Sequence, residues 1–225
     1  MSHWITLVTG HGPINGWIAE PDDRPVGGIV LVHEIFGVNA DMHKNAERYA
    51  AKGYLTVVPA LFDAVQREVE LDDYAPDDYR RGNELSLQVG VGTATELVAT
   101  AVDAIGHAGD IAIIGYGWGG SIALLAARKL TLPCVVYYGT HTPASPDSGM
   151  NAPVLIHHGR LDSQYTSGLP AILGNEAAPA RVLSYPTGHA FDREGDPLHY
   201  HAESSARAFE HTVKFLDQHI RARGN

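Results

Sequence analysis

Short apolar segments separated by stretches of helical periodicity constrain the fold of this chain more than any other feature. The clearest is residues 28–32, where apolar side chains are continuous instead of alternating with polar ones. A strand of that kind is covered on both faces. Further strands are predicted at 55–58, 110–114, 134–138, 154–156 and 181–185. Strands that alternate with helices predict a single α/β domain over residues 1–225, with a mostly parallel central sheet flanked by helices.

The balance of charge excludes several classes of partner. The 225 residues contain 16 Lys and Arg against 26 Asp and Glu, which gives a formal net charge of −10 with His neutral. Proteins that bind nucleic acid through phosphates, or anionic membranes through a polybasic patch, show the opposite balance. We therefore expect no nucleic-acid partner and no membrane partner.

The chain has one cysteine, Cys134, so no intrachain disulfide can form. Cys134 lies inside an apolar strand, and we interpret it as a small core residue instead of a displaced nucleophile. The first four residues lack the pattern of a secretion signal, and no apolar run reaches the roughly 20 residues that span a bilayer. These features predict a cytoplasmic protein.

Two helices and one acidic stretch can be placed between the strands. Asn39 is predicted to cap a helix that stops near Gly53. A long helix is predicted over residues 83–107, with an apolar stripe at i, i+3, i+4 and i+7. Residues 60–80 are strongly acidic and have no clear period, which fits a solvated excursion over the surface or part of a lid. The solvated interpretation is the simpler one.

A glycine-rich junction follows the strand at 110–114. Residues 115–120 read Gly-Tyr-Gly-Trp-Gly-Gly and pass directly into an apolar helix. This is the layout of a nucleophile elbow, in which small neighbours allow the strand and helix to approach closely. The nucleophile position is Gly117, which has no side chain. The alternative is a dinucleotide-binding loop, but no acidic residue follows at the required distance and the loop is not in the first βα unit.

Four segments, in this order and spacing, resemble the dienelactone hydrolase family (carboxymethylenebutenolidases), a compact branch of the α/β-hydrolases. They are His-Glu-Ile-Phe-Gly-Val-Asn at 33–39, the junction at 115–120, His-Gly-Arg-Leu-Asp at 158–162, and Tyr-Pro-Thr-Gly-His-Ala-Phe at 185–191. The resemblance implies a single-domain α/β-hydrolase fold that acts on a small ester or lactone. It also implies a cysteine at the elbow, where this chain has Gly117.

The resemblance assigns roles to further residues. Asp162 would orient His189, and His189 would act as general base and acid. Glu34 would help to activate the nucleophile, and the backbone amides of Ile35 and Trp118 would form the oxyanion hole. Taken alone, Asp162 is better explained as a helix N-cap, and His189 as a hydrogen-bonded loop histidine. The position of both residues inside family motifs, in the expected order, favours the catalytic roles.

The family also holds a substrate carboxylate with arginines, which implies a small-molecule substrate that carries such a group. Arg193 sits at the matching offset, and Arg80 or Arg81 is a second candidate. Arg80 and Arg81 can also be interpreted as solvated surface charges. No cysteine frame or HExxH pattern supports a metal, and we predict neither a metal site nor a cofactor.

A glycine at the nucleophile position leaves three hypotheses open. A catalytic residue has been replaced to trap substrate, or a weak water-mediated hydrolysis persists, or the pocket only binds a ligand. Retention of Asp162, His189 and Glu34 favours a hydrolase, whereas Gly117 favours a non-catalytic ligand-binding relative. A dinucleotide-binding oxidoreductase is a further rival.

Overall fold

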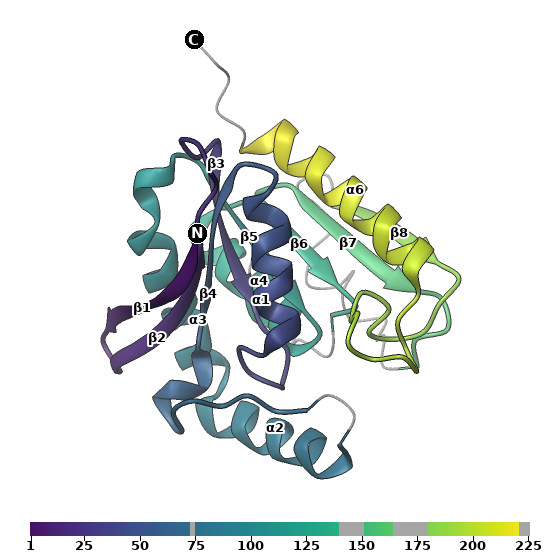
Figure 1. Cartoon of the computed structure of the whole chain (residues 1–225), viewed down its shortest axis with the longest axis horizontal. Helices are drawn as coiled ribbons and strands as arrows, with labels where there is room; N and C mark the ends of the chain where they lie inside the picture. The colour runs from purple at the N-terminus through teal and green to yellow at the C-terminus, as the bar shows by residue number, and fades with distance from the viewer. Residues whose placement is uncertain (73–74, 140–150, 164–179, 221–225) are drawn as a thin grey trace.

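Eight strands form one sheet with helices on both faces in the computed structural model, which describes residues 1–72, 75–139, 151–163 and 180–220 (Figure 1). The strands are β1 (Ser2–Thr9), β2 (Gly12–Ala19), β3 (Gly27–Val32), β4 (Tyr54–Pro59), β5 (Ile111–Tyr116), β6 (Cys134–Tyr137), β7 (Val154–Gly159) and β8 (Ala180–Tyr185). The α-helices are α1 (Ala40–Ala50), α2 (Pro76–Val89), α3 (Val91–Ala104), α4 (Trp118–Leu130) and α6 (Ala202–His219). Two 3₁₀ turns, η1 (Leu61–Ala64) and η2 (Gly106–Ala108), complete the described elements.

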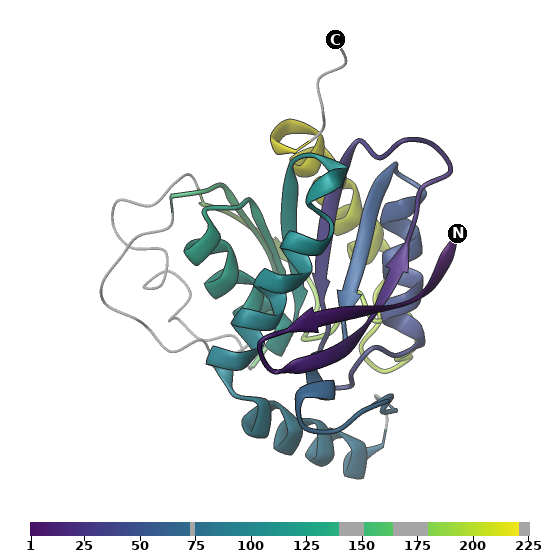
Figure 2. The same ribbon diagram turned by 90° about the vertical axis from the view of Figure 1, so that its left-hand side faces the viewer.

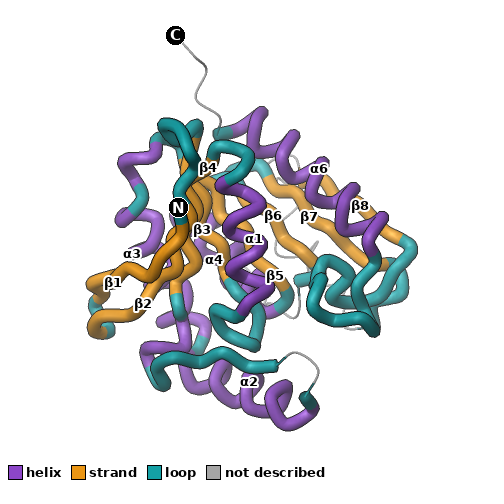
Figure 3. The backbone as a smooth tube through the Cα atoms, in the orientation of Figure 1, coloured by secondary structure: helices purple, strands orange, loops and turns teal. Residues whose placement is uncertain are grey.

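The sheet has the order β1-β2-β4-β3-β5-β6-β7-β8. The β1–β2 hairpin is antiparallel, β2 pairs antiparallel with β4, and every pairing from β4 to β8 is parallel. This confirms the predicted mostly parallel α/β fold. Because parallel strands end at the same edge, the segments that follow β3, β5, β6, β7 and β8 gather there. Figure 3 shows loops collected at that edge, together with α2.

Helices cover both faces of the sheet. In Figure 1 α1 and α6 lie in front of the sheet, and Figure 2 shows α3 and α4 on the opposite side. Val30 and Val32 pack in the cluster that includes α3 and α4, while Ile29 and Leu31 pack in the cluster that includes α1 and α6. All four side chains are fully buried. Burial on both faces explains why the apolar residues of β3 are continuous.

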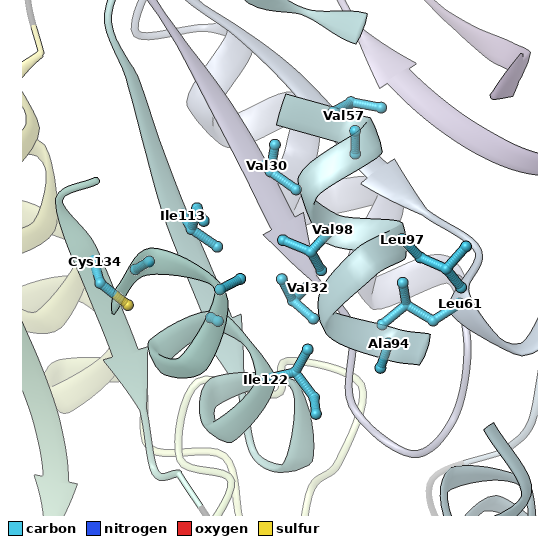
Figure 4. Close-up of a cluster of buried hydrophobic side chains, with 14 of the residues drawn as sticks. Val30, Val32, Val57, Leu61, Ala94, Leu97, Val98, Ile113, Ile122 and Cys134 are labelled. Carbon is cyan, nitrogen blue, oxygen red and sulfur yellow. The ribbon is translucent and has the colours of Figure 1, made fainter. Parts of the chain in front are cut away.

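Cys134 belongs to the same core, as the sequence predicts. Its side chain is fully buried in the cluster with Ile113 and Ile122, and Figure 4 shows it beside α4. Burial raises the pKa of the Cys134 thiol far above its ordinary value. A thiol that stays protonated is a poor nucleophile, so Cys134 acts as a packing residue.

The single helix predicted over residues 83–107 is wrong, because two helices cover this region. Gly90 separates α2 from α3 with φ 72° and ψ 156°, and the two helix axes meet at 83°. A positive φ at this position suits glycine. Among the described residues no single helix is long and apolar enough to cross a membrane, and only the bent pair α2–α3 meets the length and composition for one. The bend turns α2 under the carboxyl ends of the strands (Figure 1).

The other helix predictions hold more closely. Asn39 caps α1, with its side-chain oxygen accepting a hydrogen bond from the Met42 amide at 3.2 Å. The stretch over residues 60–80, predicted to be a solvated excursion or part of a lid without a clear period, begins with η1, and its residues from Pro76 onward belong to α2. Between them, the described residues up to 72 contact the turn after β3. There Gly37 and Glu70 form an isolated antiparallel bridge, and the Leu71 amide donates to the Phe36 carbonyl at 2.9 Å. Backbone hydrogen bonds therefore fix this part of the stretch to the turn after β3.

The packing of α2 predicts an unusual response to a helix-favouring substitution. A Cβ added at Gly82 would come within 2.1 Å of the Ile35 carbonyl oxygen, whereas a Cβ at Gly92 in α3 would meet nothing within 4 Å. Alanine normally stabilises a helix relative to glycine. We expect Gly82→Ala to lower the free energy of unfolding by about 1–3 kcal/mol through overpacking, and Gly92→Ala to raise it by a few tenths or more. Urea unfolding of both variants checks this, and equal gains in stability would contradict the close contact.

Candidate active site

Gly117 forms a sharp turn between β5 and α4. Its φ of 51° and ψ of −120° are strained for a residue that carries a Cβ. A Cβ on Gly119 would lie 2.2 Å from the His33 carbonyl oxygen, and one on Gly115 would lie 2.2 Å from the Gly119 carbonyl oxygen. These contacts explain the small residues on either side of the turn. A Cβ at Gly117 would face Glu34, with Oε2 at 3.2 Å.

Asp162 and His189 are brought together at the carboxyl edge of the sheet. Asp162 follows β7 and His189 follows β8, and His189 Nδ1 lies 2.8 Å from Asp162 Oδ2. The Asp162 side chain is buried and the His189 side chain is 17% exposed. With Nδ1–H donated to the carboxylate, a neutral ring carries its lone pair on Nε2, the atom that can take a proton from a substrate or water. The alternative of Asp162 as a helix N-cap concerns residues 164–179, which lie outside the described residues.

Glu34 is held by two partners from distant parts of the chain. Arg193 forms an ion pair with Glu34 through Nη2 and Oε2, and Arg193 Nε lies 3.4 Å from Oε1. The Tyr138 hydroxyl donates to Oε1 at 3.1 Å. Arg193 Nη1 also donates to Asp196 Oδ2 at 3.2 Å, and its guanidinium lies 4.8 Å from the Phe36 ring centroid. The carboxylate that faces Gly117 therefore has a fixed orientation and a balanced charge.

Tyr138 is a residue of the site that no sequence motif marks. It follows β6 with φ 38°, a conformation that is uncommon for a bulky residue. Its hydroxyl binds Glu34, and its ring packs edge-on against His189 with 5.1 Å between centroids. Burial raises the pKa of the Tyr138 hydroxyl well above its ordinary value, so the group remains a donor. Tyr138 thus joins the Glu34 side of the site to the His189 side.

The two amides predicted to form the oxyanion hole come from the elbow and from the turn after β3. Trp118 is the first residue of α4, and the first amides of a helix have no acceptor inside that helix. Ile35 directly follows Glu34 in the turn after β3, and α2 packs against its carbonyl oxygen. The positive end of the α4 dipole points in the same direction as the Trp118 amide. Both amides are backbone groups, so their presence does not depend on the residue at 117.

His33 forms a rigid support under Glu34. Its ring is fully buried, its Nδ1 lies 2.5 Å from the Glu34 carbonyl oxygen, and its Nε2 accepts from the Leu61 amide at 3.1 Å. The ring also lies 4.9 Å from the Phe62 centroid and 6.0 Å from that of Trp118. Burial lowers the pKa of His33 to about 4, so the ring is neutral near pH 7 and its tautomer is set by these two bonds.

Arg80 and Arg81 lie on the exposed surface of α2. Arg80 Nη2 is 3.1 Å from Asp77 Oδ1, and Arg81 Nη1 is 3.2 Å from Glu84 Oε2. Their side chains are 69% and 37% exposed. The structure brings Arg193 to the elbow, but it gives Arg80 and Arg81 surface ion pairs, which contribute little to stability.

Two of the histidines that could suggest a metal site, His157 and His199, have structural partners. His157 is fully buried, with Nδ1 2.9 Å from the Tyr185 hydroxyl and Nε2 2.9 Å from Thr212 Oγ1. Burial lowers the pKa of His157 to about 3. His199 Nδ1 lies 2.6 Å from Asp196 Oδ2. In the part of the chain that the structure describes, no three His, Cys, Asp or Glu side chains are arranged to hold a metal ion.

Comparisons with known proteins identify the family. The model of the dienelactone hydrolase family matches residues 14–220. This chain belongs to the dienelactone hydrolase family. It is 30% identical to the carboxymethylenebutenolidase of Pseudomonas sp. strain P51, over 86% of this chain and 85% of that one. It is 27% identical to carboxymethylenebutenolidase 1 of Cupriavidus pinatubonensis, over 86% of each chain.

Solved structures support the fold. The dienelactone hydrolase from Anabaena variabilis matches with a TM-score of 0.69 at 18% identity, covering 98% of this chain and 99% of that one. The α/β-hydrolase architecture of this dienelactone hydrolase family member is therefore established, and the family is one of hydrolases.

The buried His33 ring predicts a loss of stability in acid. Its pKa is about 4 in the folded chain against 6.5 ordinarily, so the unfolded chain binds more protons between these values. Stability should fall as the pH drops from 6.5 to 4, by about 3 kcal/mol from this group. We expect His33→Gln to show a correspondingly smaller difference between its unfolding free energies at pH 7 and pH 4.

Two results would contradict this assignment. One is an unchanged pH dependence of stability in the variant. The other is a His33 ring that titrates near its ordinary value when followed by NMR in the unmodified chain, a measurement that does not require the variant to fold.

Proposed function

We propose that this chain hydrolyses a small ester or lactone with a water molecule in place of a side-chain nucleophile. The observation that carries the proposal is the 2.8 Å contact between His189 Nδ1 and Asp162 Oδ2 at the carboxyl edge of the sheet. A buried carboxylate that orients a partly exposed imidazole is the arrangement of a general base. Gly117 supplies no atom to attack a carbonyl, so the base has only water to activate.

The reaction then has a single tetrahedral intermediate. Nε2 of His189 takes a proton from the water as its oxygen attacks the ester carbonyl, and the negative charge develops on the carbonyl oxygen. The amides of Ile35 and Trp118 donate hydrogen bonds to that oxyanion. The carbon–oxygen bond to the alcohol breaks, and His189 returns the proton to the leaving oxygen. The products are a carboxylic acid and an alcohol, and no acyl group is attached to the protein.

Glu34 has a supporting role in this scheme. Its Oε2 would lie 3.2 Å from a Cβ at Gly117, so the carboxylate borders the space that a nucleophilic side chain would fill. A carboxylate oxygen accepts more than one hydrogen bond, so Oε2 can accept from water as well as from Arg193. Glu34 would thereby orient the attacking water. Tyr138 contacts both Glu34 and His189, and it would hold the two side chains in fixed positions relative to each other.

Arg193 is the group that we assign to a substrate carboxylate. Its guanidinium is buried beside the elbow and already binds Glu34 and Asp196. A planar guanidinium fork donates to a carboxylate in bidentate fashion, which is the geometry that we assign to the substrate carboxylate. We do not assign Arg80 and Arg81 to the substrate carboxylate, because their guanidinium groups form ion pairs on the surface of α2.

A non-catalytic ligand-binding relative is the second candidate, and Gly117 is the observation that favours it. Loss of covalent attack removes several orders of magnitude of rate, although ~10³–10⁴ over the uncatalysed reaction survives in hydrolases that keep only binding and an oxyanion hole. The two candidates therefore differ in whether His189 affects turnover or only binding.

Hydrolysis rates of small aryl esters and of a dienelactone test the proposal. We expect the unmodified chain to show slow turnover that His189→Ala abolishes, with no burst of product, because no acyl intermediate forms. Gly117→Cys should be faster by orders of magnitude and should show a burst. Gly117→Ala is the matched control, since it introduces the same strain at φ 51° without a thiol.

Each outcome decides between the candidates. Turnover in the unmodified chain that His189→Ala removes supports water activation. Turnover in Gly117→Cys alone would show that the other active-site residues are intact. It would also show that the unmodified chain only binds its ligand. Inactivity of the unmodified chain and of both variants, His189→Ala and Gly117→Cys, toward every ester and lactone would overturn the proposed hydrolysis, provided that melting temperatures show folded proteins.

The role of Arg193 predicts a selective effect on substrate binding. Arg193→Lys keeps the positive charge beside Glu34 but loses the bidentate fork. We expect the KM for an ester that carries a carboxylate to rise about tenfold, while the KM of the matching neutral ester changes little. Steady-state kinetics on the paired esters checks this. Equal effects on both esters would show that Arg193 does not contact the substrate carboxylate.

A further inference from the structure

A cavity of about 320 Å³ lies outside the residues assigned to hydrolysis. It is bounded by the β1–β2 hairpin, the turn after β3, and the acidic segment that follows β4. Its lining includes Trp4, His33, Phe62, Asp63, Glu68 and Glu70. This volume is in the range of sites for small organic molecules. Residues of the acidic stretch, which has no role in the hydrolytic scheme, form part of the cavity wall.

An aromatic layer separates this cavity from the elbow. Phe62 lies with its ring 4.9 Å from that of His33 and 5.6 Å from that of Trp118, measured between centroids. His33 and Phe62 line the cavity, and Trp118 starts the helix on the elbow side. Glu34, Gly117 and His189 are not among the residues that line the cavity, so a ligand bound there would not occupy the position of the attacking water.

The charge of the lining selects for a cation. Three carboxylates, those of Asp63, Glu68 and Glu70, line the cavity, and no Lys or Arg of the described residues does. The one lining histidine among them, His33, is neutral near pH 7 because burial lowers its pKa to about 4. The nearby Arg67 instead donates to the Pro13 carbonyl oxygen at 2.8 Å. A concave surface with charge of one sign concentrates ligands of the other.

The aromatic wall indicates what kind of cation fits. Trp4 is 43% exposed, although tryptophan is a residue that folding normally covers. Its ring is held edge-on against Trp17 and His43, with centroids 5.4 and 5.6 Å away. A held indole face beside carboxylates is a recognition surface for alkylammonium groups, through cation–π attraction.

A metal ion fits the cavity less well. Among the described residues no three His, Cys, Asp or Glu side chains converge as a metal site requires. Asp63 already accepts the Asn15 amide on Oδ2 at 2.8 Å and the Glu68 amide on Oδ1 at 3.2 Å. The carboxylates thus line a cavity without converging on one position. This arrangement suits the diffuse charge of an organic head group better than a metal ion.

The wall of the cavity is fixed by the fold itself. The Gly37–Glu70 bridge attaches the acidic segment to the turn after β3, and a Cβ at Gly37 would come within 2.1 Å of the Val69 carbonyl oxygen. The Asp63 contacts fix the same segment to β2. A preformed site loses little conformational entropy on binding.

We propose that this cavity is a second binding site, for a small organic cation with an alkylammonium head group. Trp4 would contact the head group, and Glu68 and Glu70 would balance its charge. The proposal does not rest on hydrolytic activity, so a failure of one leaves the other intact.

Isothermal titration of the full chain with choline tests the proposal, and 3,3-dimethyl-1-butanol is the matched neutral ligand because carbon replaces its nitrogen. We expect choline to bind about tenfold more tightly than the neutral alcohol, which corresponds to the combined cation–π and charge terms. The difference should shrink as salt is added. Equal affinities for the two ligands, or no saturable binding of choline in the millimolar range, would overturn the proposal.

Variants locate the binding. Trp4→Leu and Glu70→Gln should each weaken choline binding several-fold and leave the weak binding of the neutral alcohol nearly unchanged. Glu84→Gln, on the exposed side of α2, is the control for a loss of one negative charge elsewhere. Melting temperatures verify that each variant is folded. Choline binding that survives both cavity substitutions, or that Glu84→Gln weakens equally, would place the cation elsewhere.

Discussion

The buried ion pair between Glu34 and Arg193 connects the parts of the molecule on which the candidate site depends. Glu34 follows β3 near the start of the chain, and Arg193 lies in the loop after β8, 159 residues later. Both side chains are nearly buried, at 11% and 9% exposure. A buried pair of this kind is costly to break from one side, because the remaining charge has no water to solvate it. The geometry of the pair therefore fixes the position of the loop after β3 relative to the loop after β8.

Several contacts extend from that pair. Tyr138 binds Glu34 and packs on His189, so the loop after β6 is fixed to the loops after β3 and β8. Asp196 binds the opposite side of Arg193 and also accepts from His199. The dyad of Asp162 and His189 can keep its 2.8 Å contact without a nucleophile beside it, because its position is set by neighbours that do not include residue 117.

A large part of this arrangement can be predicted from the sequence, for a physical reason. Continuous apolar runs identify strands that are buried on both faces, and parallel strands bring their carboxyl ends to one edge. Residues directly after those strands, such as Glu34, Asp162 and His189, can therefore be grouped from their positions in the chain alone. The family resemblance then supplies their expected roles.

The features that the sequence does not predict depend on contacts between distant residues or on a single dihedral angle. Tyr138 reaches Glu34 across 104 positions, and no local pattern marks a tyrosine at a strand end as a bridge. The apolar stripe of α3 continues smoothly toward α2, so periodicity alone predicts one helix where Gly90 separates two that meet at 83°. Arg80 and Arg81 are positively charged residues in an acidic region, and only the structure shows that carboxylates of the same helix pair with them.

Backbone packing around the elbow determines the conformation of Gly117. Gly117 has a φ of 51°, although it has no side chain that could require this conformation. The close approach of Gly119 to the His33 carbonyl, and of Gly115 to Gly119, fixes the path of the backbone on both sides. The strained geometry is thus a property of the strand–helix packing and not of the residue at its tip. A glycine relaxes that strain, and the same packing fixes Trp118 as the first residue of α4. The hydrolysis that we propose requires only backbone donors, the His189 base and water, so it does not depend on a side chain at residue 117.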